Sequence, residues 1–281
     1  MKVVATGRSQ LLAARIAAGM GAEVAEARFS RFPDGEHGLQ RGPLDGETVV
    51  VGSVVDADSL VQLLLLIDAC RDSEINLVVP YLGYARQDRA FREGEPISAR
   101  AIAGALGRGI SRVVTVHAHK ETVLSHFGVP ARNVTLEAAI ADYIAGLGLT
   151  RPAILAPDHG ALSFARAVAA RGGWEAQHLE KTRISGTEVR MEAKSLDARD
   201  RDVVMVDDII STGNTLGAAA KMLRAAGAKG VHAVGVHGVF VGGALDLLKN
   251  AGIREIACSD TIETPSSRFS AAAAIASALS R

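Results

Sequence analysis

The sequence predicts an α/β protein built from two similar halves, each with a mostly parallel sheet flanked by helices. Short runs of β-branched residues alternate with alanine-rich and leucine-rich stretches from one end of the chain to the other. This alternation is typical of parallel strands that helices cover on both faces. The chain has 281 residues, of which 48% are hydrophobic, so it is long enough for one large or two ordinary domains with packed cores.

In the first half, β-branched runs predict four strands and the stretches between them predict three helices. The expected strands are 2–6, 48–54, 76–80 and 112–117. The expected helices are 10–19, 59–71 and 98–106.

The second half restarts the same pattern. Its expected strands are 153–156, 202–206, 231–237 and 255–258. Its expected helices are 161–171, 215–226 and 244–250, and the alanine-rich tail 270–280 predicts a final helix. The two halves show no alignable repeat, so their similarity rests on this rhythm alone. We expect one domain over residues 1–146 and another over 147–281, with the final helix able to pack back on the first.

Charge and cysteine content point to a small-molecule partner. Lysine plus arginine number 31 and aspartate plus glutamate also number 31, so no overall field draws the protein to nucleic acid or to an anionic membrane. Cys70 and Cys258 lie far apart without a CxxC spacing, which favours a reducing cytoplasm. The first eight residues do not resemble a signal peptide, and the apolar stretch 60–67 is too short to span a bilayer.

A candidate phosphate-binding loop lies between an apolar strand at 203–206 and a helix that starts near residue 215. The small-residue turn consists of Ser211, Thr212, Gly213, Asn214 and Thr215. Consecutive backbone N–H groups at the amino terminus of a helix favour a phosphate, and the loop lacks the lysine of a Walker loop, so we expect a terminal monophosphate. The paired acids Asp207 and Asp208 can accept hydrogen bonds from ribose hydroxyls or hold Mg²⁺. Together these groups indicate ribose 5-phosphate.

Two alternatives remain open for this loop. Asp208 and Ser211 can instead cap the following helix, which for the bare residues is about equally expected. The ten-residue pattern 206–215 as a whole resembles the signature of proteins that bind phosphoribosyl pyrophosphate. Both phosphoribosyltransferases, which consume that compound, and the synthetase that makes it carry this signature.

The segment 80–89, Pro-Tyr-Leu-Gly-Tyr-Ala-Arg-Gln-Asp-Arg, favours the synthetase. It resembles a stretch of the ribose-phosphate pyrophosphokinase family that phosphoribosyltransferases lack, and 31–36 resembles the family's loop that reaches ATP across a subunit interface. The resemblance implies two phosphoribosyltransferase-like domains and a homo-oligomer with ATP at the interface. The implied ATP-binding residues are Phe32, Asp34, Gly35, Glu36, Arg86, Gln87, Asp88 and His119.

The resemblance also implies the metal and catalytic residues. His119 and Asp158, the latter in a Pro-Asp-His-Gly turn, match the family's positions for Mg²⁺ bound with ATP. His117 and His119 are expected to end a strand and to project to the same face, although many relatives have an acid at position 117. Lys181 and Arg183 match the family's Lys-x-Arg element, and alternation along an extended strand points both into one pocket. They are the expected catalytic residues, with Arg183 also binding ribose 5-phosphate, at the start of a closing loop over 182–193 with Gly186 as a hinge.

The implied reaction transfers the β,γ-pyrophosphoryl group of Mg-ATP to the C1 hydroxyl of ribose 5-phosphate, giving phosphoribosyl pyrophosphate and AMP for nucleotide biosynthesis. Such a displacement depends on positioning and cations rather than on a protein nucleophile. A phosphoribosyltransferase and a non-catalytic regulatory subunit of the synthetase are the two alternatives. Asn214, where relatives commonly have a glycine, and His37-Gly38 are further departures from the family pattern.

Overall fold

The computed structural model describes residues 1–44, 46–183, 189–192 and 198–280, which form two compact units. Unit 1 contains Met1–Thr135, Asp260–Glu263 and Ser270–Arg281, and unit 2 contains Leu136–Ser259 and Thr264–Phe269. The first division of the chain therefore lies at Thr135, whereas the expected domains met at residue 146. The difference is the helix α4 (Glu137–Gly146), which the sequence pattern did not reveal and which packs on α5 in unit 2.

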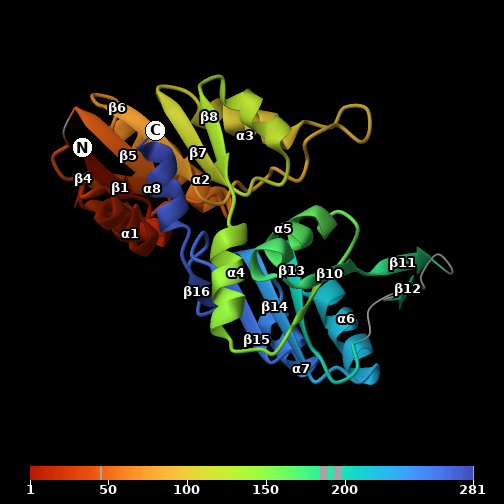
Figure 1. The fold of residues 1–281 in the computed structure, drawn as a ribbon. Helices are drawn as coiled ribbons and strands as arrows, with labels where there is room; N and C mark the ends of the chain where they lie inside the picture. Colours follow the sequence, from red (N-terminus) through yellow and green to blue (C-terminus); the bar gives the residue numbers. More distant parts are fainter. Residues whose placement is uncertain (45, 184–188, 193–197, 281) are drawn as a thin grey trace. The chain divides into compact units, whose positions relative to one another are not determined.

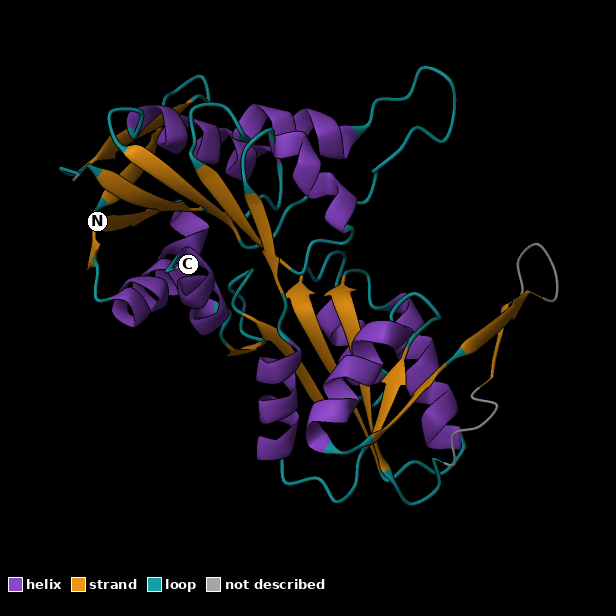
Figure 2. Cartoon of the chain, turned by 45° about the horizontal axis from the view of Figure 1, so that its top comes forward, coloured by secondary structure: helices purple, strands orange, loops and turns teal. Residues whose placement is uncertain are grey.

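Unit 1 contains a six-stranded parallel sheet in the order β2-β1-β5-β6-β7-β8. The strands are β1 (Lys2–Ala5), β2 (Glu23–Val24), β5 (Glu47–Val51), β6 (Glu74–Val79), β7 (Arg112–Val116) and β8 (Ala131–Val134). Helices α1 (Gln10–Met20) and α8 (Ala272–Leu279) cover one face, and α2 (Ala57–Ala69) and α3 (Ser98–Leu106) cover the other (Figures 1 and 2). Two short 3₁₀ helices, η1 (Gly7–Ser9) and η2 (Glu121–Phe127), complete the unit with the antiparallel hairpin β3 (Ala27–Arg31) and β4 (His37–Arg41).

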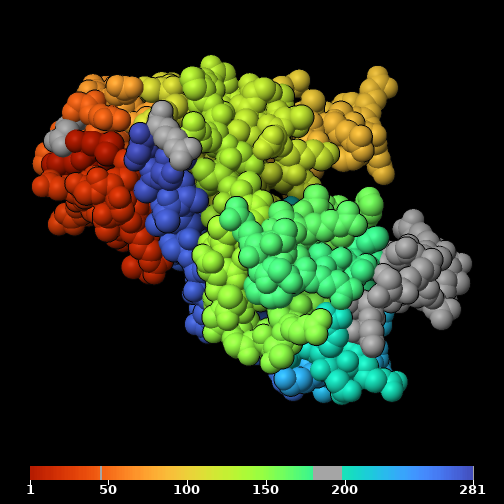
Figure 3. All heavy atoms as spheres, viewed as in Figure 1, coloured from red at the N-terminus to blue at the C-terminus, as the bar shows by residue number. Residues whose placement is uncertain are grey.

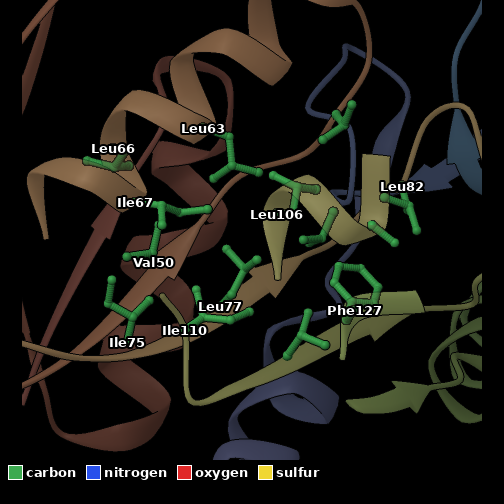
Figure 4. Close-up of a cluster of buried hydrophobic side chains, with 14 of the residues drawn as sticks. Val50, Leu63, Leu66, Ile67, Ile75, Leu77, Leu82, Leu106, Ile110 and Phe127 are labelled. Carbon is green, nitrogen blue, oxygen red and sulfur yellow. The ribbon is translucent and has the colours of Figure 1, made fainter. Parts of the chain in front are cut away.

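The core under α2 and α3 explains why the central strands are apolar. Leu63 and Leu66 of α2 and Leu106 of α3 are fully buried against Val50 and Leu77 of the sheet (Figure 4). Each buried side chain of this size contributes roughly 1.5–3 kcal/mol. A parallel sheet covered on both faces favours nearly continuous runs of apolar residues in its strands, which is the signal that revealed these strands in the sequence.

Unit 2 contains a second six-stranded parallel sheet, in the order β10-β9-β13-β14-β15-β16. Its strands are β9 (Ala153–Ala156), β10 (Glu175–His178), β13 (Asp202–Ile210), β14 (Gly230–Gly238), β15 (Glu255–Ser259) and β16 (Ser267–Phe269). Helices α4 and α5 (Leu162–Gly172) lie on one face, and α6 (Asn214–Ala225) and α7 (Ala244–Asn250) on the other (Figure 1). The antiparallel pair β11 (Glu180–Arg183) and β12 (Val189–Glu192) follows β10.

The two units share one strand topology. Without the hairpins, each sheet runs 2-1-3-4-5-6 in its own chain order, and each has an antiparallel pair inserted after its second strand. The predicted class, two similar α/β halves with mostly parallel sheets, is therefore confirmed. Among the described residues, no helix is long and apolar enough to cross a membrane.

Two local expectations were wrong. Strand β13 does not end at Val206 but continues to Ile210, because it pairs in parallel with β14 from Asp202 as far as Ile210. Strand β7 ends at Val116, and His117 has a φ of 45°, outside the extended region. The alternation of a strand therefore does not apply to His117 and His119, and the argument that they project to one face fails.

Candidate functional site

The candidate phosphate-binding loop lies at the carboxyl edge of the unit 2 sheet. Strand β9 pairs with β13 only through Val203–Met205, whereas β14 accompanies β13 to its end. Asp207 and Asp208 thus stand beyond the last β9 pairing, with β14 along one side only. Ligands bind at this edge in open parallel sheets, where the loops from successive strands meet.

No side chain accepts a hydrogen bond from the first backbone amides of α6 as a helix cap. Its N-cap is Gly213, with a φ of 74°, and no side chain caps the helix. The alternative that Asp208 and Ser211 serve as caps is therefore wrong. A Cβ atom at Gly213 would come 3.0 Å from Leu248 of α7, so glycine provides both the left-handed turn and the close packing of the loop. Asn214, the departure from the family pattern, is the exposed first residue of the helix.

The Asp207 carboxyl lies in an environment that disfavours its charge. Burial, together with the charges of Asp208 and Asp158, raises the pKa of Asp207 to about 8. The Asp208 amide donates to the Asp207 carboxylate at 3.0 Å, which offsets part of this effect. A group that donates hydrogen bonds, or a cation, would relieve the repulsion among these carboxylates.

The corresponding edge of unit 1 is filled by the protein's own groups. Helix α2 follows β5 as α6 follows β13, but it begins with a capping box in which Asp56 accepts from the Ser59 amide at 2.8 Å. Arg8 pairs with the same Asp56 at 3.0 Å. At α1, the Leu12 amide donates to the Glu263 carboxylate at 2.7 Å. Where unit 2 leaves a helix terminus open, unit 1 places its own carboxylates.

Hairpin β3–β4 presents the first of the predicted ATP loops at its tip. Arg31 and His37 are cross-strand partners on either side of this tip, and both contact Asp58 of α2, at 2.5 and 3.3 Å. The turn is closed by the Phe32 amide, which donates to the Glu36 carbonyl at 2.8 Å. Asp34 accepts from the Glu36 amide at 3.2 Å, which places both predicted nucleotide acids on one tight turn.

The departure His37-Gly38 now has a structural reason. A Cβ atom at Gly38 would come within 3.2 Å of the Phe32 ring and 2.5 Å of the Ser30 hydroxyl, so glycine makes room for both side chains. The Phe32 ring is nevertheless 55% exposed, which suits a residue that stacks on a ligand. Gly35 has a φ of 96°, as this turn requires.

The second predicted ATP loop joins β6 to α3 and stands clear of the surface of unit 1 (Figures 1 and 3). Its root is fixed because the Gln87 carbonyl accepts from the Ala99 amide at 3.2 Å and the Gln87 side chain accepts from the Ser98 hydroxyl at 2.9 Å. Asp88 pairs with Lys120 at 2.7 Å. Arg86, Gln87 and Asp88 are therefore consecutive residues of one anchored turn.

The structure gives only part of the predicted metal site. His119 lies in the loop after β7 in unit 1, and Asp158 lies after β9 in unit 2, where it accepts from the Ala161 amide at 3.1 Å. Among the residues that the structure describes, no group of three or more histidine, cysteine, aspartate or glutamate side chains is arranged to hold a metal. The charges of Asp208 and Asp158 both raise the pKa of Asp207, so the three carboxylates lie in one region of unit 2.

The predicted catalytic residues lie on the antiparallel pair of unit 2. Lys181 and Arg183 belong to β11, where their register partners in β12 are Met191 and Val189. The extended conformation expected for 181–183 is present. The predicted hinge Gly186 lies outside the described residues, as does most of the loop that contains it.

The structure adds residues that the sequence pattern did not single out. Lys120 directly follows His119, so its position next to a predicted ligand could have marked it as a candidate site residue in the sequence. Phe91 is 63% exposed and lies under the Arg89 guanidinium, 5.2 Å from the ring centre. Nothing in the sequence around Asp58 indicates its contact with the hairpin, because only the fold brings the two together.

Comparisons with known proteins cover nearly the whole chain. A family model described as the N-terminal domain of ribose phosphate pyrophosphokinase matches residues 1–108, and a phosphoribosyl transferase domain model matches residues 130–241. A ribose-phosphate pyrophosphokinase of Methanosarcina acetivorans is 45% identical over 100% of both chains. The ribose-phosphate pyrophosphokinase 2 of Archaeoglobus fulgidus is 40% identical, covering 98% of this chain and 99% of its own.

A solved structure gives the same result. The crystal structure of phosphoribosylpyrophosphate synthetase from Mycobacterium smegmatis superimposes with a TM-score of 0.84 at 26% identity. The match covers 99% of this chain and 97% of that chain.

Proposed function

Because the chain belongs to the ribose-phosphate pyrophosphokinase family, we propose that it makes 5-phosphoribosyl 1-pyrophosphate and AMP from ATP and ribose 5-phosphate. The observation that carries this proposal is the open terminus of α6 beside two partly buried carboxylates. That edge offers N–H groups for a phosphate and acceptors for a diol. We place the reaction in the cytoplasm, at the entry to nucleotide biosynthesis.

Ribose 5-phosphate occupies the edge of unit 2. Its phosphate lies against Ser211, Thr212, Gly213, Asn214 and Thr215, with Arg183 as a further cation. Asp207 and Asp208 accept hydrogen bonds from the ribose hydroxyls, which suits ionised carboxylates. Ligand binding therefore favours the charged form of Asp207, against the environment of the free protein.

ATP lies on the loops of unit 1. Phe32 stacks near the adenine, Asp34, Gly35 and Glu36 line the nucleotide, and the remaining contacts come from Arg86, Gln87, Asp88 and His119. The exposed Phe32 ring at the tip of a tight hairpin supports a contact outside its own unit. We therefore propose a homo-oligomer in which this hairpin completes the ATP site of a neighbouring subunit.

The reaction is a displacement at the β-phosphorus of ATP. The C1 hydroxyl of ribose 5-phosphate forms a bond to that phosphorus and loses its proton, while the bond to the oxygen shared with the α-phosphate breaks and AMP leaves. Lys181 and Arg183 meet the charge that spreads over the phosphoryl oxygens. Mutual orientation of the two substrates supplies much of the rate, so no protein nucleophile is required.

Mg²⁺ is the cofactor that suits these residues. It keeps several waters and requires only one or two protein carboxylates when phosphates supply the other oxygens, so Asp158 in the repelling cluster is a suitable partner. His119 would act through water or phosphate, because Mg²⁺ prefers oxygen ligands. When bound, the ion neutralises phosphate charge and aligns the pyrophosphate.

The test is AMP release from ATP and Mg²⁺ in the presence and absence of ribose 5-phosphate. We expect AMP only when the sugar is present, and Lys181→Ala should lower turnover by about three orders of magnitude or more while ribose 5-phosphate binding stays measurable. A phosphoribosyltransferase would not require ATP, and a regulatory subunit would form no AMP. Near-normal turnover of Lys181→Ala would remove that residue from the catalytic role.

A further inference from the structure

Lys120 and Asp88 form an ion pair that joins two loops of unit 1. The Lys120 Nζ lies 2.7 Å from the Asp88 Oδ2, although the residues are 32 positions apart in the chain. Asp88 is largely covered, with 15% of its side chain exposed, whereas the Lys120 side chain is 48% exposed. The hydrogen bond from Lys120 lowers the pKa of Asp88, so the carboxylate stays ionised.

Each loop also has its own anchor to a neighbouring element. The loop after β6 is fixed to α3 through Gln87. The loop after β7 is fixed to β8, because Asn133 accepts from the Ala118 amide at 2.9 Å and the Val134 carbonyl accepts from the His117 amide at 2.7 Å. The Lys120–Asp88 contact therefore links directly two loops that are otherwise held by different elements, α3 and β8. It sets the spacing between Asp88 and the residue that precedes Lys120, His119.

The charges of Lys120 and Asp88 suggest a role for this contact in binding a nucleotide. A nucleoside triphosphate is a multiply charged anion, and an unpaired Asp88 beside it would repel the polyphosphate. Lys120 offsets that charge, and because its side chain is half exposed and an ammonium has three donors, it can also donate to a phosphate oxygen. An ion pair whose lysine is half exposed contributes little to folding stability, so stability alone gives this pair no evident role.

We propose that Lys120 is a nucleotide-positioning residue that neutralises Asp88 and holds the two loops at the separation that the polyphosphate of a nucleoside triphosphate requires. This inference rests on the proposed function, because it assumes that the loops after β6 and β7 bind ATP. It adds a residue that neither the motif of the first loop nor the histidine of the second identifies.

The test compares Lys120→Met, which keeps length and removes charge, with Lys120→Arg, which keeps charge. The control is Lys249→Met on the exposed part of α7 in unit 2. We expect Lys120→Met to raise the KM for ATP about tenfold, while kcat and the KM for ribose 5-phosphate change by less than about twofold. Lys120→Arg should restore most of the ATP affinity, and the control should behave as wild type.

An unchanged KM for ATP in Lys120→Met overturns the proposal, as does an equal loss for both substrates or a loss that Lys120→Arg does not restore. Calorimetric binding of ATP with Mg²⁺ separates this outcome from failure of the proposed function. If wild type binds ATP but forms no AMP, the function is wrong, and the inference stands only if Lys120→Met still binds about tenfold more weakly. If wild type does not bind ATP, both are wrong.

Discussion

At the scale of one residue, the Asp207 carboxyl in the proposed binding site lowers the stability of the ligand-free protein at neutral pH. Burial and the neighbouring charges of Asp208 and Asp158 raise its pKa to about 8, whereas an unfolded chain would have a value near 3.8. Between about pH 4 and pH 8, Asp207 is therefore protonated in the folded, ligand-free protein but ionised in the unfolded chain. Folding stability is therefore lost as the pH rises from about 4 to about 8.

Replacing Asp207 with asparagine should remove this cost. At pH 8 the ligand-free variant is expected to unfold at a higher temperature, with a gain on the order of 2–3 kcal/mol, because the unfolded state no longer gains from ionisation. The gain should disappear as the pH falls towards 4, where both states are protonated. Thermal unfolding across this range measures it, with Asp142→Asn on the exposed face of α4 as the control. A variant less stable than wild type at pH 8 would contradict the account.

At the scale of elements, α2 and α6 start at equivalent positions and satisfy their first amides differently. Asp56 and Ser59 cap α2 from within the chain, whereas α6 begins at Gly213 without a side-chain cap. The free amides of a helix start require a partner, which can be a side chain, water or a ligand. The contrast supports the proposal that the phosphate binds in unit 2 rather than in unit 1.

This contrast predicts opposite effects of two small substitutions. Asp56→Ala should lower the free energy of unfolding by about 1 kcal/mol and leave the KM for ribose 5-phosphate unchanged, because it removes a cap. Ser211→Ala should raise that KM severalfold with little effect on stability, because it removes a ligand contact. Chemical denaturation and steady-state kinetics on both variants decide the matter. If both substitutions changed the free energy of unfolding equally, or both changed the KM for ribose 5-phosphate equally, the two helix starts would not differ in role.

The central elements were predictable because their signals are local. The buried strands β9 and β13 and the helices α3 and α7 are visible as apolar runs and periodic stretches. The short strand β2 and the edge strand β8 were missed because they are partly exposed and carry mixed residues. The extension of β13 through Asp207 and Asp208 depends on its pairing with β14, which no local pattern shows.

The same limit applies to the candidate site. The phosphate loop and the segment 86–88 are each continuous in the sequence, so motifs alone are enough to identify them. The contacts of Asp58 with Arg31 and His37, and of Lys120 with Asp88, join residues from different loops. Only the fold brings them together. The sequence pattern also could not tell a capped helix start from an open one, because Ser211 and Asp208 suit both.

At the scale of the whole molecule, two units with one topology have different roles in the proposed reaction. The matching strand orders and the hairpin after each second strand are what duplication of an ancestral α/β unit would produce. In unit 1 the inserted hairpin carries the proposed adenine contacts, and in unit 2 the corresponding pair carries Lys181 and Arg183. The two insertions are thus the proposed sites of nucleotide binding and of catalysis.

An ATP site shared between subunits predicts complementation between two defective variants. Phe32→Ala removes the donated ring, and Arg86→Ala damages the receiving loop, so each homo-oligomer should have low activity. When the two variants are produced together in equal amounts, roughly one quarter of the sites combine an intact ring with an intact loop. Activity of about a quarter of wild type is expected in the mixed oligomer. Activity no higher than that of the separate variants would place Phe32 and Arg86 in one subunit's site.

In the proposed reaction, a pyrophosphoryl group moves as a unit to the sugar at the open start of α6. ATP labelled at its γ-phosphorus, incubated with Mg²⁺, ribose 5-phosphate and the protein, tests this transfer. We expect the transferred label in a diphosphate at C1 of the sugar, with one unlabelled AMP formed for each product molecule. Formation of ADP with a singly phosphorylated C1, or release of the label as inorganic phosphate without AMP, would contradict the account.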